Sequence, residues 1–280
     1  MKKIRKFAIA ALAACMIFSM AACGSGSSGN SSSADPNADS GDVTDQTFKA
    51  ALEPTFPPFD TTDSSGKLTG LDVDLVNAIA EDQGFTVKWE NLQFDGLIPA
   101  LQAGNIDIIA SGMSITPERE KQVDFSDPYY DSGLVVAVAS DNNTIKGEDD
   151  LTSDMKVAVQ IGTTGAAEAQ DLKDDGKIAE VVVLPQLDTA MMQLINGDVD
   201  AVINDKPVTE AYIAKQGDKI KMVGDVINAD SYGIAVQKGN KSLQAAFNAG
   251  LTNIKDNGTY DELVAKWFSD TSSLAGDTSA

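Results

Sequence analysis

The segment LQAGNIDIIASG (residues 101–112) recurs later in the chain as LINGDVDAVIND (residues 194–205). The two align without gaps at an offset of 93 residues, pairing Gly104 with Gly197, Asp107 with Asp200 and Gly112 with Asp205. Each reads as a helix end, a glycine turn, an aspartate, an apolar strand and a polar loop at the carboxyl end of that strand. The repeat predicts two similar lobes, although the common chemistry of helix–strand units could also produce the match by chance.

The repeat also indicates where a ligand would bind. In open α/β sheets, ligands lie beyond the carboxyl ends of the strands. Gly112 and Asp205 follow the two matching strands, one in each predicted lobe. We therefore expect these two residues to face each other across a cleft.

The rest of the folded body alternates short apolar runs with segments of helical period, which is typical of an α/β protein. We expect strands at residues 48–52, 85–89, 106–110, 134–139, 156–160, 181–184, 201–203 and 233–236. Apolar residues between 71 and 80 form one helix face, and Gly84 follows where a left-handed C-cap is favoured. Further helical stripes lie at residues 243–254 and 262–268.

Two turn-prone segments suggest the lobe boundaries. YYDSG (residues 129–133) and NADSYG (residues 228–233) bracket roughly 100 residues, and two crossings between the same lobes would make a hinge. We predict that residues 48–130 and 232–270 form the first lobe. Residues 131–231 form the second lobe, and residues 271–280 form a flexible tail.

The N-terminus has the features of an export signal. Residues 1–6, four of which are basic, precede an apolar stretch of 16 residues, which is shorter than the roughly 20 residues of a membrane-spanning helix. Small residues precede both Cys15 and Cys23, but only Cys23 opens directly onto a polar Gly/Ser segment. The segment resembles the lipobox of bacterial lipoproteins, which implies a signal peptide over residues 1–22 and lipidation of Cys23. A secreted protein with a free thiol is the alternative.

Residues 23–47 are predicted to be a disordered tether, because residues 24–47 contain almost nothing apolar and no lysine or arginine. Several acyl chains on Cys23 would then hold the protein at the cell membrane, on its extracytoplasmic face.

Composition excludes several function classes. The formal net charge of −21 argues against nucleic acid and against an anionic lipid surface as partners. The chain has no histidine, and its two cysteines both lie near the N-terminus. Ser-His-Asp and Cys-His catalysis and His or Cys zinc sites are therefore excluded. We expect no cofactor, no metal and a monomer.

Arg119 is the only arginine after residue 22, although the same part of the chain contains 16 lysines. A guanidinium offers a planar fork that meets a carboxylate with two parallel hydrogen bonds, which an ammonium cannot reproduce. This predicts that Arg119 binds a carboxylate. A surface arginine at a helix start is the alternative.

Six segments carry a resemblance to a known family. They are LEPTFPPFD (52–60), GLDVDLVNAIAE (70–81), FDGLIPALQAGNIDIIASGMSITPEREKQVDFSDPYY (94–130), VAVQIGTTG (157–165), GDVDAVINDKP (197–207) and NGTYDELVAKWF (257–268). In this order the chain resembles the extracellular solute-binding proteins for polar amino acids that serve ABC importers. The resemblance implies a periplasmic-binding-protein-like α/β fold with two lobes, each a sheet flanked by helices, joined by a hinge of two crossings.

The resemblance also implies which residues hold the ends of an amino acid. Arg119 corresponds to the arginine that pairs with the ligand's α-carboxylate, and Asp205 to the aspartate that accepts its α-ammonium. Gly112 and Ser114 match positions of the pocket wall. Asp205 could instead cap the helix that begins beside Pro207.

Further positions match the carboxylate-binding loop and the part of the pocket around the ligand's side chain. Thr163 and Thr164 fall in the loop, at a helix start that suits an anion, although threonine is also an ordinary N-cap. Phe56 and Phe94 match aromatic residues on either side of the ligand, or could be core. Glu53 and Gln160 match positions near the ligand's distal end, where Glu53 suits a cationic side chain and Gln160 an amide.

The sequence therefore predicts a binding protein that takes up a polar amino acid, with a cationic or amide side chain favoured, and delivers it to an ABC-type permease. A dehydratase-like enzyme on the same scaffold and a ligand-sensing receptor without transport are the alternatives.

Overall fold

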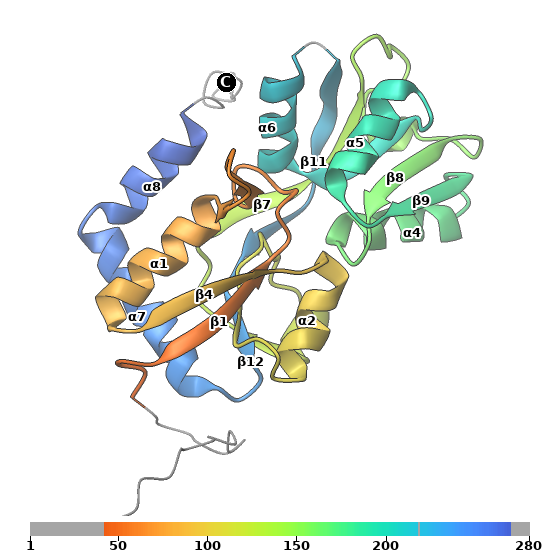
Figure 1. Cartoon of the computed structure of the whole chain (residues 1–280). Helices are drawn as coiled ribbons and strands as arrows, with labels where there is room; N and C mark the ends of the chain where they lie inside the picture. The colour runs from red at the N-terminus through yellow and green to blue at the C-terminus, as the bar shows by residue number, and fades with distance from the viewer. Residues whose placement is uncertain (1–41, 218, 270–280) are drawn as a thin grey trace, which may run out of the picture. The chain divides into compact units, whose positions relative to one another are not determined.

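The computed structural model describes residues 42–217 and 219–269 and contains two five-stranded sheets (Figure 1). The strand order in the first sheet is β4 (Thr86–Asn91), β1 (Thr47–Leu52), β5 (Ile108–Ile109), β12 (Ala235–Gln237) and β6 (Val123–Phe125). In the second it is β11 (Ile220–Tyr232), β7 (Tyr130–Ala139), β10 (Ala201–Asp205), β8 (Lys156–Gln160) and β9 (Glu180–Leu184). A small hairpin joins β2 (Thr61–Thr62) to β3 (Leu68–Thr69). The predicted signal peptide, Cys23, the tether up to residue 41 and the tail at 271–280 lie outside the described residues.

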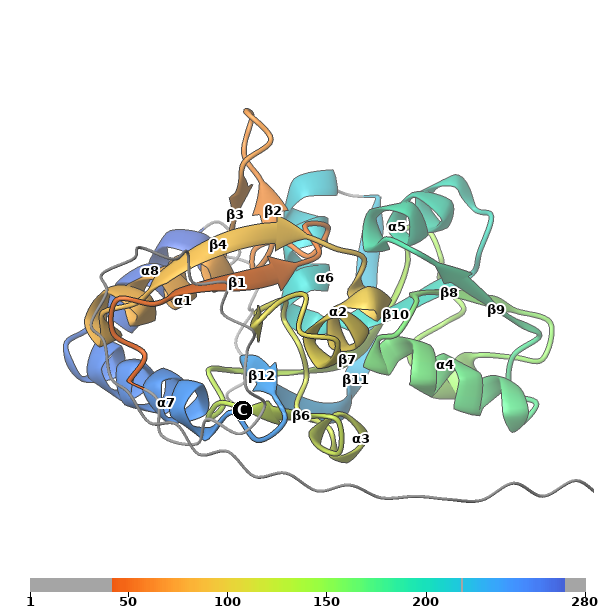
Figure 2. The same cartoon turned by 60° about the horizontal axis from the view of Figure 1, so that its bottom comes forward.

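Helices cover both sheets, which confirms the predicted α/β fold with two helix-flanked sheets. The helices of the first sheet are α1 (Leu71–Gln83), α2 (Phe94–Gln102), α3 (Pro117–Glu120), α7 (Lys241–Asp256) and α8 (Thr259–Phe268). Those of the second are α4 (Thr164–Asp174), α5 (Leu187–Asn196) and α6 (Lys206–Gln216). Helices α1, α7 and α8 pack on one another, whereas α2 contacts β1, β5 and β12 (Figure 2). A short 3₁₀ turn lies at Glu148–Asp150.

The two copies of the sequence repeat have the same structural role. In the first sheet, the backbone N–H of Asp107 donates to the carbonyl of Lys49, and the Asp107 carboxylate accepts the N–H of Lys49 at 2.8 Å. In the second sheet, Asp200 makes the same pair of bonds with Lys156, and its carboxylate accepts at 2.7 Å. Each repeat aspartate therefore anchors the start of its own strand to a lysine of the neighbouring parallel strand.

The two segments expected to be hinge turns are instead paired strands. Tyr130 lies opposite Tyr232, Asp131 opposite Ser231 and Ser132 opposite Asp230 in the antiparallel β7–β11 pair. The backbone passes from one sheet to the other through these extended strands. Polar residues occur within 228–231 because they lie on β11, an edge strand with register irregularities between Val223 and Ala229. Gly133 in the neighbouring strand β7 allows a close approach, because an added Cβ would lie 3.1 Å from the Cα of Ala229.

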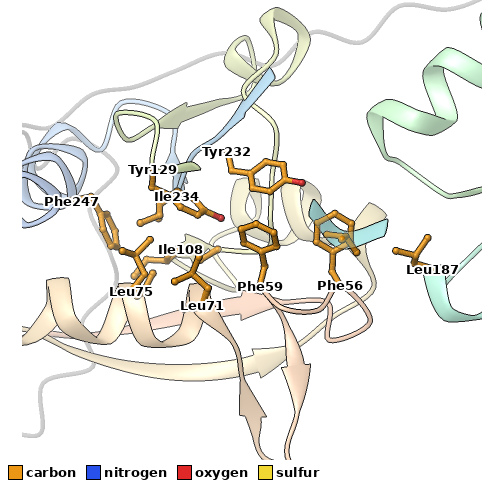
Figure 3. Packing of buried hydrophobic residues seen from close by; sticks show 14 of the residues in the cluster. Phe56, Phe59, Leu71, Leu75, Ile108, Tyr129, Leu187, Tyr232, Ile234 and Phe247 are labelled. Carbon is orange, nitrogen blue, oxygen red and sulfur yellow. The ribbon is translucent and has the colours of Figure 1, made fainter. Parts of the chain in front are cut away.

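The hydrophobic core around the crossing strands is aromatic. The ring of Phe59 packs edge-on against those of Tyr232 and Tyr130, with centroids 5.0 and 4.9 Å apart. Tyr232 is fully buried. Figure 3 shows Phe56 between Phe59 and Leu187, the first residue of α5. One buried cluster thus includes side chains from the elements of both sheets.

Candidate functional site

Nine of the ten predicted ligand-binding residues line one cavity. The first sheet and its helices contribute Phe56, Phe94, Gly112, Ser114 and Arg119, and the second contributes Gln160, Thr163, Thr164 and Asp205. The cavity leaves only about 10 Å³ of space, close to the minimum for one water molecule. An amino acid would fit only if these side chains moved or the two walls separated.

Arg119 is held at the start of α3 with its guanidinium in the cavity. Thr116 caps this helix by accepting the backbone N–H of Arg119 at 3.2 Å. The guanidinium donates to the Ser114 carbonyl at 2.8 Å on its own side and to the Gly162 carbonyl at 3.1 Å on the opposite side. It also lies 5.4 Å from the centre of the Phe94 ring. The surface alternative for Arg119 is wrong, because its exposed fraction is 8%.

The guanidinium keeps its charge and has donors to spare. Burial lowers the pKa of Arg119, and the charges of Asp205 and Asp230 act in the opposite direction. An arginine has five N–H donors and does not lose its proton in proteins. The two bonds to carbonyls therefore leave further donors for a ligand carboxylate.

Asp205 brings a negative charge from the opposite wall. Burial raises the pKa of Asp205 to about 7, as does Asp230, while Arg119 and hydrogen bonds from Tyr232 and Ser132 lower it. Asp205 precedes α6, but its side chain makes no capping hydrogen bond to the described backbone. Its carboxylate is instead turned towards the hydroxyl of Ser132, at 3.4 Å. The helix-capping alternative for this side chain is therefore wrong.

Gly112 is a position where a larger residue would obstruct the site. Its φ of +50° is in the left-handed region, and an added Cβ would lie 2.5 Å from the ring of Phe56. The Gly112 N–H donates to the buried carboxylate of Asp72 at 2.7 Å, and the hydroxyl of Tyr129 donates to the same carboxylate at 2.7 Å. Gly112 and Phe56 thus form one closely packed wall.

The loop before α4 presents the N-terminus of that helix to the cavity. Thr163 is the N-cap, and its hydroxyl accepts the N–H of Ala166 at 3.1 Å and donates to the Gln160 carbonyl at 2.8 Å. The ordinary capping role is therefore present, and it uses a lone pair of the Thr163 hydroxyl oxygen, whereas the hydroxyl proton is donated to the Gln160 carbonyl. Thr164 lines the cavity as the first residue of α4.

Glu53 does not line the cavity but lies directly behind Gln160. Glu53 has an exposed fraction of 1%, which excludes the alternative of a solvated loop acid. Its Oε2 accepts the Gln160 side-chain amide at 3.1 Å and the Thr55 hydroxyl at 2.7 Å. Its Oε1 accepts no hydrogen bond from the described residues. Burial raises the pKa of Glu53, and these hydrogen bonds lower it.

Sequence reasoning missed three polar groups around the site. Asp72 fixes Gly112, Ser132 contacts Asp205, and Asp230 lies close enough to affect the pKa values of both Arg119 and Asp205. Ser132 and Asp230 both fall in the segments interpreted only as hinge turns. An aspartate between the core residues Leu71 and Val73 was the one available signal for Asp72.

None of the helices within residues 42–217 and 219–269 has both the length and the apolar character that a membrane-spanning segment needs. The same residues contain no group of three or more His, Cys, Asp or Glu side chains that could hold a metal ion.

Two helix-flanked sheets with oppositely charged groups on facing walls of one cavity define a two-lobed ligand-binding protein. The chain belongs to the bacterial extracellular solute-binding proteins, family 3, whose model matches residues 48–270.

Relatives and solved structures agree with this family. A protein of Neisseria gonorrhoeae named "Probable histidine-binding protein" is 35% identical over 266 residues, covering 93% of this chain and 94% of the relative. The Escherichia coli "ABC transporter arginine-binding protein 1" is 33% identical over 219 residues, covering 76% and 87%.

Among solved structures, an ancestral arginine-binding protein bound to arginine superposes with a TM-score of 0.76 and 42% identity, over 79% of this chain and 98% of that one. The ancestral amino-acid-binding protein AncCDT-1, a precursor of cyclohexadienyl dehydratase, superposes with a TM-score of 0.73 and 39% identity, over 79% and 95%.

Proposed function

We propose that the protein binds a polar α-amino acid between its two lobes and delivers it to an ABC-type permease. The observation that carries this proposal is the presence of Arg119 and Asp205 on opposite walls of one cavity. A zwitterion with its carboxylate on Arg119 and its ammonium on Asp205 would satisfy both charges. Because each lobe would bind one charged end of the amino acid, ligand binding would favour the arrangement in which the two lobes are closed.

A cationic side chain is the ligand type that the distal end of the site supports best. Glu53 is buried beside Gln160, and one of its carboxylate oxygens accepts no hydrogen bond from the described residues. A buried carboxylate is costly unless a cation or a donor meets it. The names of the relatives, which specify arginine and histidine, support the same choice. An amide ligand is the second choice, through Gln160.

Calorimetry with all twenty amino acids tests the binding function. The protein is first unfolded and refolded, in metal-free buffer, so that ligand carried through purification is removed. We expect one ligand per chain, with arginine, lysine or histidine among the tightest. If no amino acid binds more tightly than about 1 mM, equivalent to about −4 kcal/mol, the proposal is wrong.

Membrane attachment through Cys23 is also part of the proposal. The support is the sequence alone: small residues before Cys23 and a polar segment after it. Cys23→Ser should release the protein from the membrane fraction of the cells that make it, and Cys15→Ser serves as the matched control. Lipid on Cys23 should appear in the mass of the N-terminal peptide. Equal membrane association of both variants would contradict the anchor.

An enzyme on the same scaffold is the second candidate, favoured by the similarity to AncCDT-1. Asp205, whose pKa is raised to about 7, could transfer a proton near neutral pH. Mass spectrometry of the bound compound after long incubation separates the candidates. We expect the ligand to be recovered unchanged, whereas conversion to a product would support the enzyme.

A further inference from the structure

A chain of hydrogen bonds crosses between the lobes next to the ligand cavity. The backbone N–H of Leu187, at the start of α5, donates to the Thr55 hydroxyl oxygen at 3.3 Å. The Thr55 hydroxyl donates to Oε2 of Glu53 at 2.7 Å. Thr55 follows β1 of the first sheet, whereas α5 packs on β8 of the second. The chain therefore runs from one lobe, through Thr55, to the acid behind the cavity.

The direction of each bond in this chain is fixed by chemistry. A backbone N–H can only donate, so Leu187 must use a lone pair of the Thr55 oxygen. The single hydroxyl proton of Thr55 is then free to point at Glu53. The N-cap residue of α5, Gln186, makes no side-chain cap within the described chain. The N–H of Leu187 has no partner within its own helix, because it lies in the first turn of α5. Thr55 in the other lobe supplies that partner.

The three hydrogen bonds that Glu53 accepts at 3.3 Å or less converge on one oxygen, and the Gln186 side chain is a further donor that lowers the pKa of Glu53. Oε2 accepts the Thr55 hydroxyl, the Thr55 N–H at 3.3 Å and the Gln160 amide at 3.1 Å. Oε1 accepts none from the described residues, although it is buried. These contacts fix the plane of the Glu53 carboxylate and leave Oε1 available for a cation or a further hydrogen-bond donor.

We propose that Thr55 is a positioning residue, whose hydroxyl orients the Glu53 carboxylate towards a cationic ligand side chain when the two lobes close. The proposal rests on the proposed function, because it assigns Glu53 to the ligand's distal end. Neither Glu53 nor Thr55 lines the cavity in the structure as it stands. We assign the ligand contact to Glu53 because its Oε1 accepts no hydrogen bond from the described residues, whereas the Thr55 hydroxyl already contacts Leu187 and Glu53. Opening the lobes would break the Leu187 bond, so the orientation of Glu53 is coupled to closure.

The test compares L-arginine with L-citrulline, which has the same shape but a neutral urea group in place of the guanidinium. Calorimetry gives the ratio of the two affinities for each variant. Thr55→Val keeps the branched shape and removes the hydroxyl, and we expect it to lower the arginine-to-citrulline ratio by about tenfold, the usual scale for a hydrogen bond to a charged group. Thr55→Ser retains the hydroxyl and should restore the ratio.

Tyr212→Phe provides the matched control. The Tyr212 hydroxyl donates to the Thr55 backbone carbonyl at 3.1 Å, which is a second contact across the lobes that does not use the Thr55 side chain. Removing it weakens closure for any ligand. Both affinities should therefore fall by the same factor, and the ratio should not change.

The outcomes separate this inference from the proposed function. If Thr55→Val lowers both affinities equally, or neither, Thr55 does not position Glu53 and the inference is wrong. A wild-type ratio near one would also overturn it, although amino-acid binding itself would stand. Absence of binding by every amino acid would instead refute the proposed function. Should Thr55→Val fail to fold, Thr55→Ala carries the same expectation.

Discussion

At the position of Arg119, a positive charge alone would not be enough to bind a ligand carboxylate through two parallel hydrogen bonds. Its guanidinium reaches the carbonyls of Ser114 and Gly162 from opposite walls and still has donors free. A lysine in the same place would have a compact ammonium that could not form two parallel bonds to a carboxylate. The proposed function therefore depends on the shape of this group.

Arg119→Lys tests that dependence. We expect a loss of about 2 to 5 kcal/mol in ligand affinity, the usual cost of disrupting a buried, hydrogen-bonded charge pair. Lys121→Arg makes the reverse exchange at an exposed position two residues away and should leave the affinity unchanged. Calorimetry measures both. A loss of less than about tenfold, or 1.4 kcal/mol, for Arg119→Lys would place Arg119 outside the site.

Asp205 predicts a pH dependence of binding. The pKa of this carboxyl is raised to about 7, so below that pH it carries a proton in the ligand-free protein. A ligand ammonium favours the ionised form, and binding must then release the proton. We expect affinity to weaken as pH falls below about 7, by up to tenfold per pH unit.

The pH effect needs a control because Asp72 has a pKa raised to a similar value by burial. The side chain at position 205 cannot titrate in Asp205→Asn, so the weaker affinity of this variant for arginine, whose side chain keeps its charge, should not vary between about pH 5 and pH 8, the range that brackets the raised pKa. Titrations in buffers of different ionisation enthalpy would show the proton released by the wild type. The same pH dependence in Asp205→Asn would assign the effect to another group.

Helix α4 must lie close to β10 for its N-terminus to reach the cavity. Gly165 makes this possible, because a Cβ there would lie 2.7 Å from the carbonyl oxygen of Ile203. Gly96 in α2 has open space where its Cβ would be, with no described atom within 4 Å. The two helical glycines therefore differ in their surroundings.

The pair Gly165→Ala and Gly96→Ala should have opposite effects on the free energy of unfolding. Gly165→Ala should lower the free energy of unfolding by about 1 to 3 kcal/mol, because the added methyl group overpacks the contact with β10. It should also weaken ligand binding by displacing Thr163 and Thr164. Gly96→Ala should raise the free energy of unfolding by about 0.5 to 1 kcal/mol, because alanine is more favourable than glycine inside a helix. Urea denaturation measures both. Equal stabilisation of the two variants would mean that α4 does not depend on this close approach.

Helices and strands with a regular pattern of apolar residues could be predicted from the sequence, whereas strands without such a pattern could not. The strand at Lys156–Gln160 was predicted with the bounds that it has, and Gly84 takes the expected left-handed conformation after α1. The strand at Ile220–Tyr232 was missed, because an edge strand with exposed residues and register shifts shows no regular alternation. Side-chain partners from distant segments, such as Asp72 and Gly112, left no local signal.

The cavity residues were predicted mainly through the family resemblance. Composition pointed to Arg119, and the repeat pointed to Gly112 and Asp205, which the structure places in one cavity. Glu53 and Gln160 had no signal of their own, because an acid and an amide are common on loops and strand ends. Their contact joins residues 107 positions apart in the chain.

For the whole molecule, the cavity, the crossing strands and the bonds between the lobes indicate one mechanism. Arg119, Gln160 and Thr55 each take part in a hydrogen bond to the other lobe, and Arg119 and Gln160 also line the cavity. The strands β7 and β11 connect the sheets at one side. We therefore propose that ligand binding is coupled to rotation of the lobes about these strands, with residues 48–130 and 232–270 on one side and residues 131–231 on the other.

A crystal structure with an amino acid that binds in calorimetry is the most direct measurement of this mechanism. We predict that the ligand's α-carboxylate accepts two hydrogen bonds from Arg119, that its α-ammonium donates to Asp205, and that both lobes enclose it. A ligand bound elsewhere, or one that leaves either Arg119 or Asp205 without contact, would contradict the proposed binding mode.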